Sequence, residues 1–355
     1  MVSIRPPKKK PGSSSHSYWN TAYDRVAVVV NGNARGVTED LVKILDQIVE
    51  NGDLFVSRSM VEGREIARLI TERGYRTVLT GGGDGTFVQM VSWIVKIAES
   101  IQQTPPRFGL LKLGTGNALA WVLGAQRGEG EGIVADLGRL RMEEGSRLIR
   151  LIEVEDLLTP FAGLGADAIA LTHYVQVRDL FNRAKLLRTL STGAVTYSAA
   201  LLARTAPELA ISKPLNVTII NEGESAFEVG KERKPIGDPI GKGELIYKGP
   251  MRLVAFSTIP YWGFGARIFP YSDLREDRFN LRIANIGPIR ALANIRSIWK
   301  GGFQSEYLHD FLVERISIRC ETPTHFQVGG EVLGRRTVVQ AELSKRPIRF
   351  VDYYV

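Results

Sequence analysis

Two glycine-rich turns constrain this chain more than any other feature, because each lies between an apolar strand-like run and a helix-like run. The first turn, Gly81–Thr86 with the sequence GGGDGT, follows the run Thr77–Thr80. The second, Gly114–Asn117 with the sequence GTGN, follows Phe108–Leu111. Such turns leave backbone N–H groups at the positive end of the next helix, where phosphate is the commonest ligand. The pattern therefore predicts an α/β domain with phosphate-binding loops.

The organisation of the chain predicts two domains. Between residues 26 and 123, strand-like runs alternate with helix-like runs, which is typical of a parallel sheet covered by helices on both faces. Because loops at the carboxyl ends of such strands meet at one edge, both glycine turns and the segment 31–36 are expected to line one crevice. Near residue 150 the pattern changes to short strand-like runs separated by Gly, Pro and Asn, which predicts a mostly antiparallel β-sandwich.

Two stretches interrupt the second pattern. Residues 167–205 are predicted to be largely helical, and residues 222–243, rich in Gly, Glu, Lys and Pro, to form a long exposed loop. The predicted boundaries are a disordered basic tail over 1–22, an α/β domain over 23–148 and a β-sandwich domain over 149–355. These boundaries leave open a return of the last segment to the first domain.

Composition limits the classes of partner. Lys and Arg number 46 and Asp and Glu 38, so the formal net charge is +8, which favours anionic partners such as nucleotides and acidic lipid head groups. Nucleic acid is not expected, because the aromatic residues show no stacking pattern. The single cysteine, Cys320, excludes a disulfide framework. The N-terminus lacks the apolar stretch of a secretory signal, and we expect a cytoplasmic protein.

Asp84 is the residue of the first turn that most specifically indicates a function. A carboxylate beside a phosphate is repulsive unless it holds Mg²⁺ or accepts a proton from an attacking hydroxyl. The alternative is that Asp84 is the N-cap of the following helix. Familiar phosphate motifs do not fit, because Thr115 stands where the Walker pattern needs Lys and Thr86 breaks the dinucleotide pattern GxGxxG.

Together, the GGDGT sequence of Gly82–Thr86 and the GTGN sequence of Gly114–Asn117 resemble the catalytic family of diacylglycerol, sphingosine and ceramide kinases. The resemblance runs from about Arg25 to the C-terminus and is strongest over residues 26–123. It implies a nucleotide-binding α/β domain, a β-sandwich lipid-binding domain, and ATP with Mg²⁺ in the cleft between them.

The same resemblance implies roles for individual residues. Asp84 would be the catalytic base or a Mg²⁺ ligand through water. Asp167, at the end of a run that resembles the opening of the family's lipid domain, would be catalytic or contact the lipid head group. Apart from the resemblance, the basic segment 178–190 suggests that Arg178 contacts the lipid substrate or, alternatively, that it reaches the ATP phosphates in place of the absent Walker lysine. The implied ATP-binding residues are Asn31, Asn33, Ser57, Gly81, Gly82, Gly83, Gly85, Thr86, Gly114, Thr115, Gly116 and Asn117.

Three positions depart from the family pattern. Gly329 stands where members often carry the Asp of an Asp-Gly-Glu sequence, Gln89 replaces a frequent Glu after GGDGT, and Ala118 replaces a frequent Asp after GTGN. These departures suggest a divergent subgroup with altered substrate choice. They also leave room for a protein that binds lipid or nucleotide without turnover.

The predicted function is transfer of the γ-phosphoryl group of ATP to a hydroxyl of a membrane lipid, either diacylglycerol or a sphingoid base or ceramide. The alternatives are a kinase of a soluble substrate related to NAD kinases, and an inactive lipid- or nucleotide-binding protein. Basic amphipathic segments at 178–190 and 289–303 would let the protein lie peripherally on the inner face of an anionic membrane. They could equally pack on the sandwich. The oligomeric state is open, a dimer included.

Overall fold

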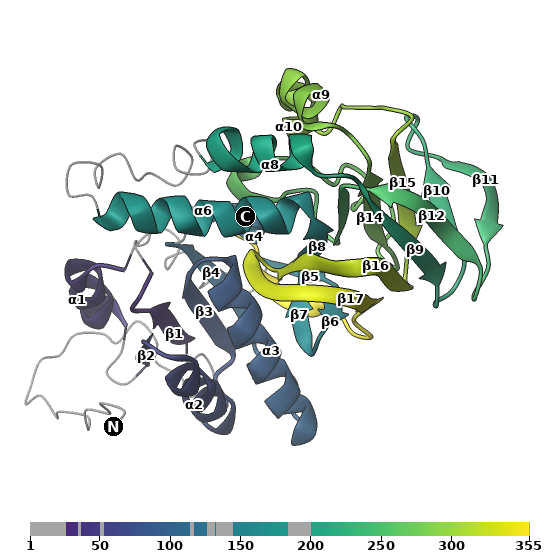
Figure 1. The fold of residues 1–355 in the computed structure, drawn as a ribbon. Coiled ribbons are helices and arrows are strands. Elements are labelled where there is room, and N and C mark those ends of the chain that lie inside the picture. The colour runs from purple at the N-terminus through teal and green to yellow at the C-terminus, as the bar shows by residue number, and fades with distance from the viewer. Residues whose placement is uncertain are drawn as a thin grey trace, which may run out of the picture. The chain divides into compact units, whose positions relative to one another are not determined.

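A computed structural model describes residues 26–34, 37–49, 53–113, 117–125, 132, 145–183 and 200–354 (Figure 1). The chain divides into two compact units. The first contains the residues up to Ile149 together with Pro347–Val355, and the second is Arg150–Arg346. No helix within these described ranges is long and apolar enough to cross a membrane.

The first unit is built on a six-stranded sheet of order β2-β1-β3-β4-β18-β5. Strands β2, β1, β3, β4 and β18 run parallel, and β5 is antiparallel to β18. The register pairs Asn31 with Ser57 and Gly82 with Lys112, so the parallel strands end at the same edge. The strands are β1 (Val26–Asn31), β2 (Leu54–Ser57), β3 (Thr77–Gly82), β4 (Arg107–Lys112), β5 (Ser146–Ile149) and β18 (Ile348–Val351).

Where the structure describes this unit, four helices accompany the sheet: α1 (Glu39–Ile48), α2 (Met60–Glu72), α3 (Asp84–Ser100) and α4 (Ala118–Leu123). Helix α1 begins after the N-cap Thr38, whose hydroxyl accepts from the Leu41 N–H at 3.2 Å. Helix α2 begins at Ser59, whose hydroxyl accepts from the Glu62 N–H at 3.2 Å. Helix α3 is apolar on nearly all sides and lies beside α2 (Figure 1).

The C-terminal segment completes the core of the first unit. Phe350 of β18 contacts the rings of Phe87 and Phe108, with centroid separations of 5.8 and 6.4 Å. The buried hydroxyl of Tyr353 donates to the Leu110 carbonyl at 3.0 Å and accepts from the Leu110 N–H at 3.1 Å. The last residues therefore hold the strand that precedes the second glycine turn.

The second unit is a 12-stranded sheet in which every pairing is antiparallel. This confirms the fold class, a parallel-rich α/β unit followed by a mostly antiparallel β unit. The strands are β6 (Ile152–Val154), β7 (Leu157–Thr159), β8 (Phe161–Gly165), β9 (Leu215–Asn221), β10 (Ala226–Val229), β11 (Pro235–Ile240), β12 (Leu245–Met251), β13 (Leu253–Ser257), β14 (Phe279–Ala284), β15 (Leu308–Val313), β16 (Arg315–Val328) and β17 (Glu331–Leu343).

The predicted long loop over residues 222–243 is wrong, because β10 and β11 lie within it and pair Val229 with Pro235. Strand β11 is an edge strand with nearly all of its residues exposed, so it lacks the apolar alternation that marks a half-buried strand. The helices of this unit are α6 (Ala166–Arg183), a π-helical turn (Leu201–Thr205), α8 (Ala206–Ile211), a 3₁₀ turn (Gly263–Gly265), α9 (Pro288–Ala293) and α10 (Ile295–Trp299). Of the predicted helical stretch, residues 184–199 lie outside the described residues.

Candidate functional site

The glycine turn and the loop after β1 meet at the carboxyl edge of the first sheet. The Asn31 side-chain amide donates to the Thr86 hydroxyl at 3.0 Å, and its carbonyl oxygen accepts from the Asn33 N–H at 2.9 Å. The Asn33 amide donates to the Arg58 carbonyl at 2.8 Å, directly after β2. Three of the predicted nucleotide-binding residues are thereby linked into one cluster.

The three successive glycines of the turn differ in what surrounds them. A Cβ at Gly81 would lie 2.8 Å from Leu113 Cδ1, and one at Gly82 would lie 2.7 Å from Thr86 Oγ1, so packing explains both. A Cβ at Gly83 would meet no atom of the described residues within 4 Å, and its φ of −90° suits any residue. Contacts among the described residues do not explain the glycine at 83, whereas a ligand against its backbone would.

The start of α3 presents backbone N–H groups beside Gly83. Gly83 is the N-cap of α3. In contrast to α1 and α2, α3 has no side-chain hydrogen bond at its N-cap among the described residues. The interpretation of Asp84 as the N-cap is therefore wrong. Because α3 has 17 residues, its N-terminus carries the full positive end of a helix dipole. This end of α3 is suited to an anion.

Asp84 connects the two phosphate-type loops. Its Oδ1 atom accepts from the N–H of Ala118 at 2.8 Å, which is the first residue of α4. The carboxylate, on the first residue of α3, thus contacts the N-terminus of α4 as well. The sequence does not indicate this bond, because it joins a backbone N–H to a side chain 34 residues away.

The second loop is seen in part. Gly114, Thr115 and Gly116 lie outside the described residues. Asn117 is buried, has a left-handed backbone with φ of 45°, and is the N-cap of α4. Ser57 ends β2 as predicted, and its hydroxyl donates to the Ser59 carbonyl at 3.1 Å.

A metal in this site would depend on few protein ligands. Among the described residues, no group of three or more His, Cys, Asp and Glu side chains is placed to hold a metal ion. Mg²⁺ at nucleotide sites is commonly held by one or two carboxylates together with substrate phosphates and water. The single carboxylate of Asp84 beside the glycine turn fits that donor set.

In the second unit, Asp167 is a buried carboxylate in the first turn of α6, with 5% of its surface exposed. Its Oδ1 accepts from the Ala168 N–H at 2.7 Å, and its Oδ2 accepts from the Gln327 amide at 3.0 Å. Burial raises the pKa of Asp167 to about 6, although both hydrogen bonds act in the opposite direction. Gly163 of β8 leaves the space that this carboxylate fills, since a Cβ there would collide with Oδ2.

The Asp167–Gln327 pair continues into the β16–β17 turn. The side-chain oxygen of Gln327 accepts from the Gly330 N–H at 2.9 Å. Gly329 and Gly330 both have positive φ, 55° and 81°, and together form a two-residue hairpin turn. That turn type favours glycine at both central positions, which gives a local reason for Gly329.

Glu331 follows this turn directly, and no sequence motif of its own marks it as a functional residue. Its side chain is exposed at the surface of the second unit. Although the residue is exposed, desolvation of its carboxyl group by neighbouring protein atoms raises the pKa of Glu331, and the charge of Arg178 opposes that change. Arg178, an exposed residue of α6, also lies 3.5 Å from Asp179 and stacks over the Tyr174 ring.

Comparisons with known proteins agree with this geometry. Residues 25–147 match the family model of the diacylglycerol kinase catalytic domain. A "Probable lipid kinase YegS-like" from Enterobacter sp. (strain 638) is 32% identical over 101 residues, which are 28% of this chain and 32% of that protein. A protein of the same description from Chromohalobacter salexigens is 31% identical over 100 residues, which are 27% of this chain and 31% of that protein.

The aligned segment therefore covers 32% and 31% of the length of these two relatives. A crystal structure of a diacylglycerol kinase from Bacillus anthracis str. Sterne aligns with a TM-score of 0.62. That alignment covers 94% of this chain and 98% of the crystallised one, at 14% identity. At this identity the likeness concerns the fold alone.

Proposed function

Because residues 25–147 match the family model of the diacylglycerol kinase catalytic domain, we propose that the chain is an ATP-dependent lipid kinase. It transfers the γ-phosphoryl group of ATP to a hydroxyl of a membrane lipid. Diacylglycerol is the first acceptor to test, and a sphingoid base or ceramide is the second. The observation that carries this proposal is the open space beside Gly83 at the start of α3.

ATP binding rests mainly on backbone groups. The N–H groups at the start of α3 face the phosphates, and the helix dipole replaces part of the charge that a Walker lysine would supply. Asn31 and Asn33 hold the neighbouring loop against the turn through their hydrogen bonds. The proposed ATP-binding set is Asn31, Asn33, Ser57, Gly81, Gly82, Gly83, Gly85, Thr86, Gly114, Thr115, Gly116 and Asn117.

Asp84 is the proposed Mg²⁺ ligand, acting through water. When bound, Mg²⁺ neutralises phosphate charge in the transition state of phosphoryl transfer. The hydrogen bond from the Ala118 N–H fixes the orientation of the Asp84 carboxylate. Asp84 also remains a candidate for the base that accepts the hydroxyl proton.

The second unit supplies another candidate base. A general base must reach the hydroxyl proton within hydrogen-bond distance and needs a pKa not far below the working pH. Asp167 has a raised pKa, but it is buried and both of its oxygens accept hydrogen bonds. Glu331 is exposed and has a raised pKa, so we assign proton acceptance to Glu331 and positioning of the turn before it to Asp167. Arg178 then faces the lipid head group.

These roles of Asp167 and Glu331 are separable by kinetics. Glu331→Gln should lower kcat about 100-fold or more with little change in KM for lipid, because it removes a proton acceptor and keeps the side-chain shape. Asp167→Asn should change kcat less than Glu331→Gln. If the two variants lose kcat in the reverse order, the assignment of the base is wrong.

The kinase proposal is tested by phosphoryl transfer from ATP labelled in the γ position, with Mg²⁺ and mixed micelles. The acceptors are diacylglycerol, monoacylglycerol, sphingosine, ceramide and, as a soluble acceptor, NAD. Label in one lipid that disappears in Asp84→Asn supports the proposal. Label in NAD alone favours a kinase of soluble substrates, and no label despite ATP binding favours a binding protein without turnover. We further propose that the protein, as a lipid kinase, lies peripherally at the cytoplasmic face of a membrane.

A further inference from the structure

Three short helices of the second unit expose large apolar side chains next to one another. Ile211, at the end of α8, is 87% exposed, and Ile289, on α9, is 81% exposed. Helices α8 and α9 are in contact, and α10 follows α9 directly. Ile295 and Trp299 of α10 are 40% and 41% exposed and lie four residues apart, so they share one helix face. Exposed apolar groups gathered in this way indicate a docking surface.

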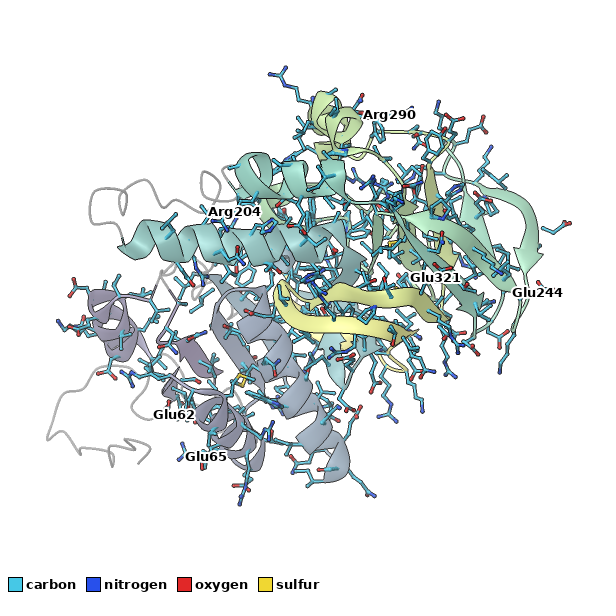
Figure 2. The ribbon with its side chains drawn as sticks, in the orientation of Figure 1. Glu62, Glu65, Arg204, Glu244, Arg290 and Glu321 are labelled. Atoms are coloured by element: carbon cyan, nitrogen blue, oxygen red, sulfur yellow. The ribbon has the colours of Figure 1, made fainter. Side chains whose placement is uncertain are left out.

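The same helices carry a one-sided charge. Arg290, Arg296 and Lys300 are all exposed, and the sequence contains no Asp or Glu between Asp277 and Glu306. Figure 2 shows Arg290 on α9 at the outer edge of the second unit, apart from Glu321 of β16. The exposed basic residues therefore lie in the same segment as exposed apolar ones, and no acidic residue of that segment neutralises them.

Local contacts leave this surface basic. Helix α8 carries one acidic residue, Glu208, which lies 3.0 Å from the Nε2 atom of His173 on α6, and the three basic residues of α9 and α10 outnumber it. Arg290 stacks over the ring of Tyr307, itself 47% exposed, at 5.7 Å. An arginine held on an aromatic ring keeps its charge available to an external anion.

We propose that this surface, formed by α8, α9 and α10 and named here the α8–α10 surface, docks onto an anionic lipid bilayer. Arginine and lysine attract acidic head groups, while isoleucine and tryptophan enter the boundary between head groups and acyl chains. A protein partner would have to place acidic groups against Arg290, Arg296 and Lys300, and the oligomeric mass measured below tests the case of a second copy of the chain. The inference deepens the proposed function, which requires the chain to reach a lipid acceptor, and it names the part of the chain that does so.

Vesicle co-sedimentation of the full chain tests the proposal without any catalysis. The probes are vesicles of phosphatidylcholine alone and of phosphatidylcholine mixed with phosphatidylglycerol. Wild type should bind only the anionic vesicles, and added salt should weaken binding. Arg290→Gln, Arg296→Gln and Lys300→Gln combined should weaken it about 100-fold, since each charge contributes about fivefold. A matched control removes the exposed Lys231, Lys242 and Lys248 of other surface segments, with the same change in net charge.

The apolar part is tested separately. Ile211→Ser combined with Ile289→Ser should weaken vesicle binding about tenfold or more, from the apolar area that no longer enters the bilayer. Val61→Ser, on the exposed face of α2, is the control, because Val61 is 71% exposed in the other unit. Thermal melts identify any variant that fails to fold, and the other variant set then carries the test.

Several results would overturn the proposal. These are absence of wild-type binding to anionic vesicles, equal losses in the control variants, and a change in oligomeric mass of the α8–α10 variants with vesicle binding intact. The last result would identify the surface as an interface between copies of the chain. Vesicle binding that depends on this surface, in a protein that labels no lipid, would uphold the docking inference while the proposed function fails.

Discussion

Replacing Gly83 with alanine separates ligand binding from folding. The added methyl group would meet no atom of the described residues within 4 Å, and φ of −90° with ψ of −179° is open to alanine. Alanine restricts the unfolded chain, which stabilises the fold by about 0.4–1 kcal/mol. Alanine is also a poorer N-cap than glycine, at a cost of up to about 1 kcal/mol. The two effects offset each other, so we expect Tm to change by less than about 4 °C.

The expected effect on ATP is much larger. If the backbone at Gly83 contacts a phosphate, the methyl group occupies the space that the ligand needs. Loss of one hydrogen bond to a charged group costs about 1.5–3 kcal/mol. That cost corresponds to an increase of about 10- to 150-fold in KM for ATP. A change in KM for ATP without a change in stability would show that Gly83 is needed for ligand binding and not for folding.

The assay measures ADP release against ATP concentration at a fixed, saturating acceptor, together with a thermal melt. Gly82→Ala is the contrasting variant, because its Cβ would lie 2.7 Å from Thr86 Oγ1 and should lower Tm. Gly83→Ala with both Tm and KM for ATP unchanged would refute the placement of a phosphate at this backbone. A large fall in Tm would instead refute the claim that the space beside Gly83 is open.

Three further perturbations test other parts of the account. Asp84→Asn keeps an oxygen that can accept from the Ala118 N–H, so a thermal melt should stay near wild type while turnover falls about 100- to 10,000-fold. The pKa of Asp167 is raised from 3.8 to about 6, so the folded state holds a proton that the unfolded state has lost. Wild-type stability in urea should therefore fall by up to about 3 kcal/mol as pH rises from about 4 to 6, and Asp167→Asn should remove this fall. Asp310→Ala leaves the buried guanidinium of Arg282, which Asp310 holds with two 2.9 Å hydrogen bonds, without its partner and should cost about 3–5 kcal/mol in a thermal or urea melt. Retention of wild-type stability in that variant would contradict the importance of this ion pair.

Much of the first unit could be predicted because its sequence signals are local. The apolar runs Thr77–Thr80 and Phe108–Leu111 are each followed by a glycine turn, and both lie within strands of the structure. Strand β11 was missed because an exposed edge strand has no burial pattern to reveal it. The pairing of β18 with β4 depends on contacts between residues far apart in sequence, which periodicity does not encode.

The site shows the same division between local and distant information. The glycine turn and Asp84 are visible as a motif, whereas the bond from Ala118 to Asp84 arises only when two loops meet. Gln327 was not singled out at all, and it reaches Asp167 across 160 residues of sequence. Glu331 could not be predicted, because its raised pKa comes from desolvation by neighbouring atoms that only the fold brings together.

The most direct test of the central claim follows the γ-phosphoryl group itself. Wild type and Gly83→Ala are incubated side by side with labelled ATP, Mg²⁺ and micellar diacylglycerol, and with ceramide or a sphingoid base in parallel. ADP and phosphorylated lipid are then measured by mass. The account predicts equal molar amounts of ADP and of one phosphorylated lipid, with both reduced in Gly83→Ala when ATP is limiting. ADP formed without any phosphorylated lipid, or equal yields from the two proteins at limiting ATP, would contradict it.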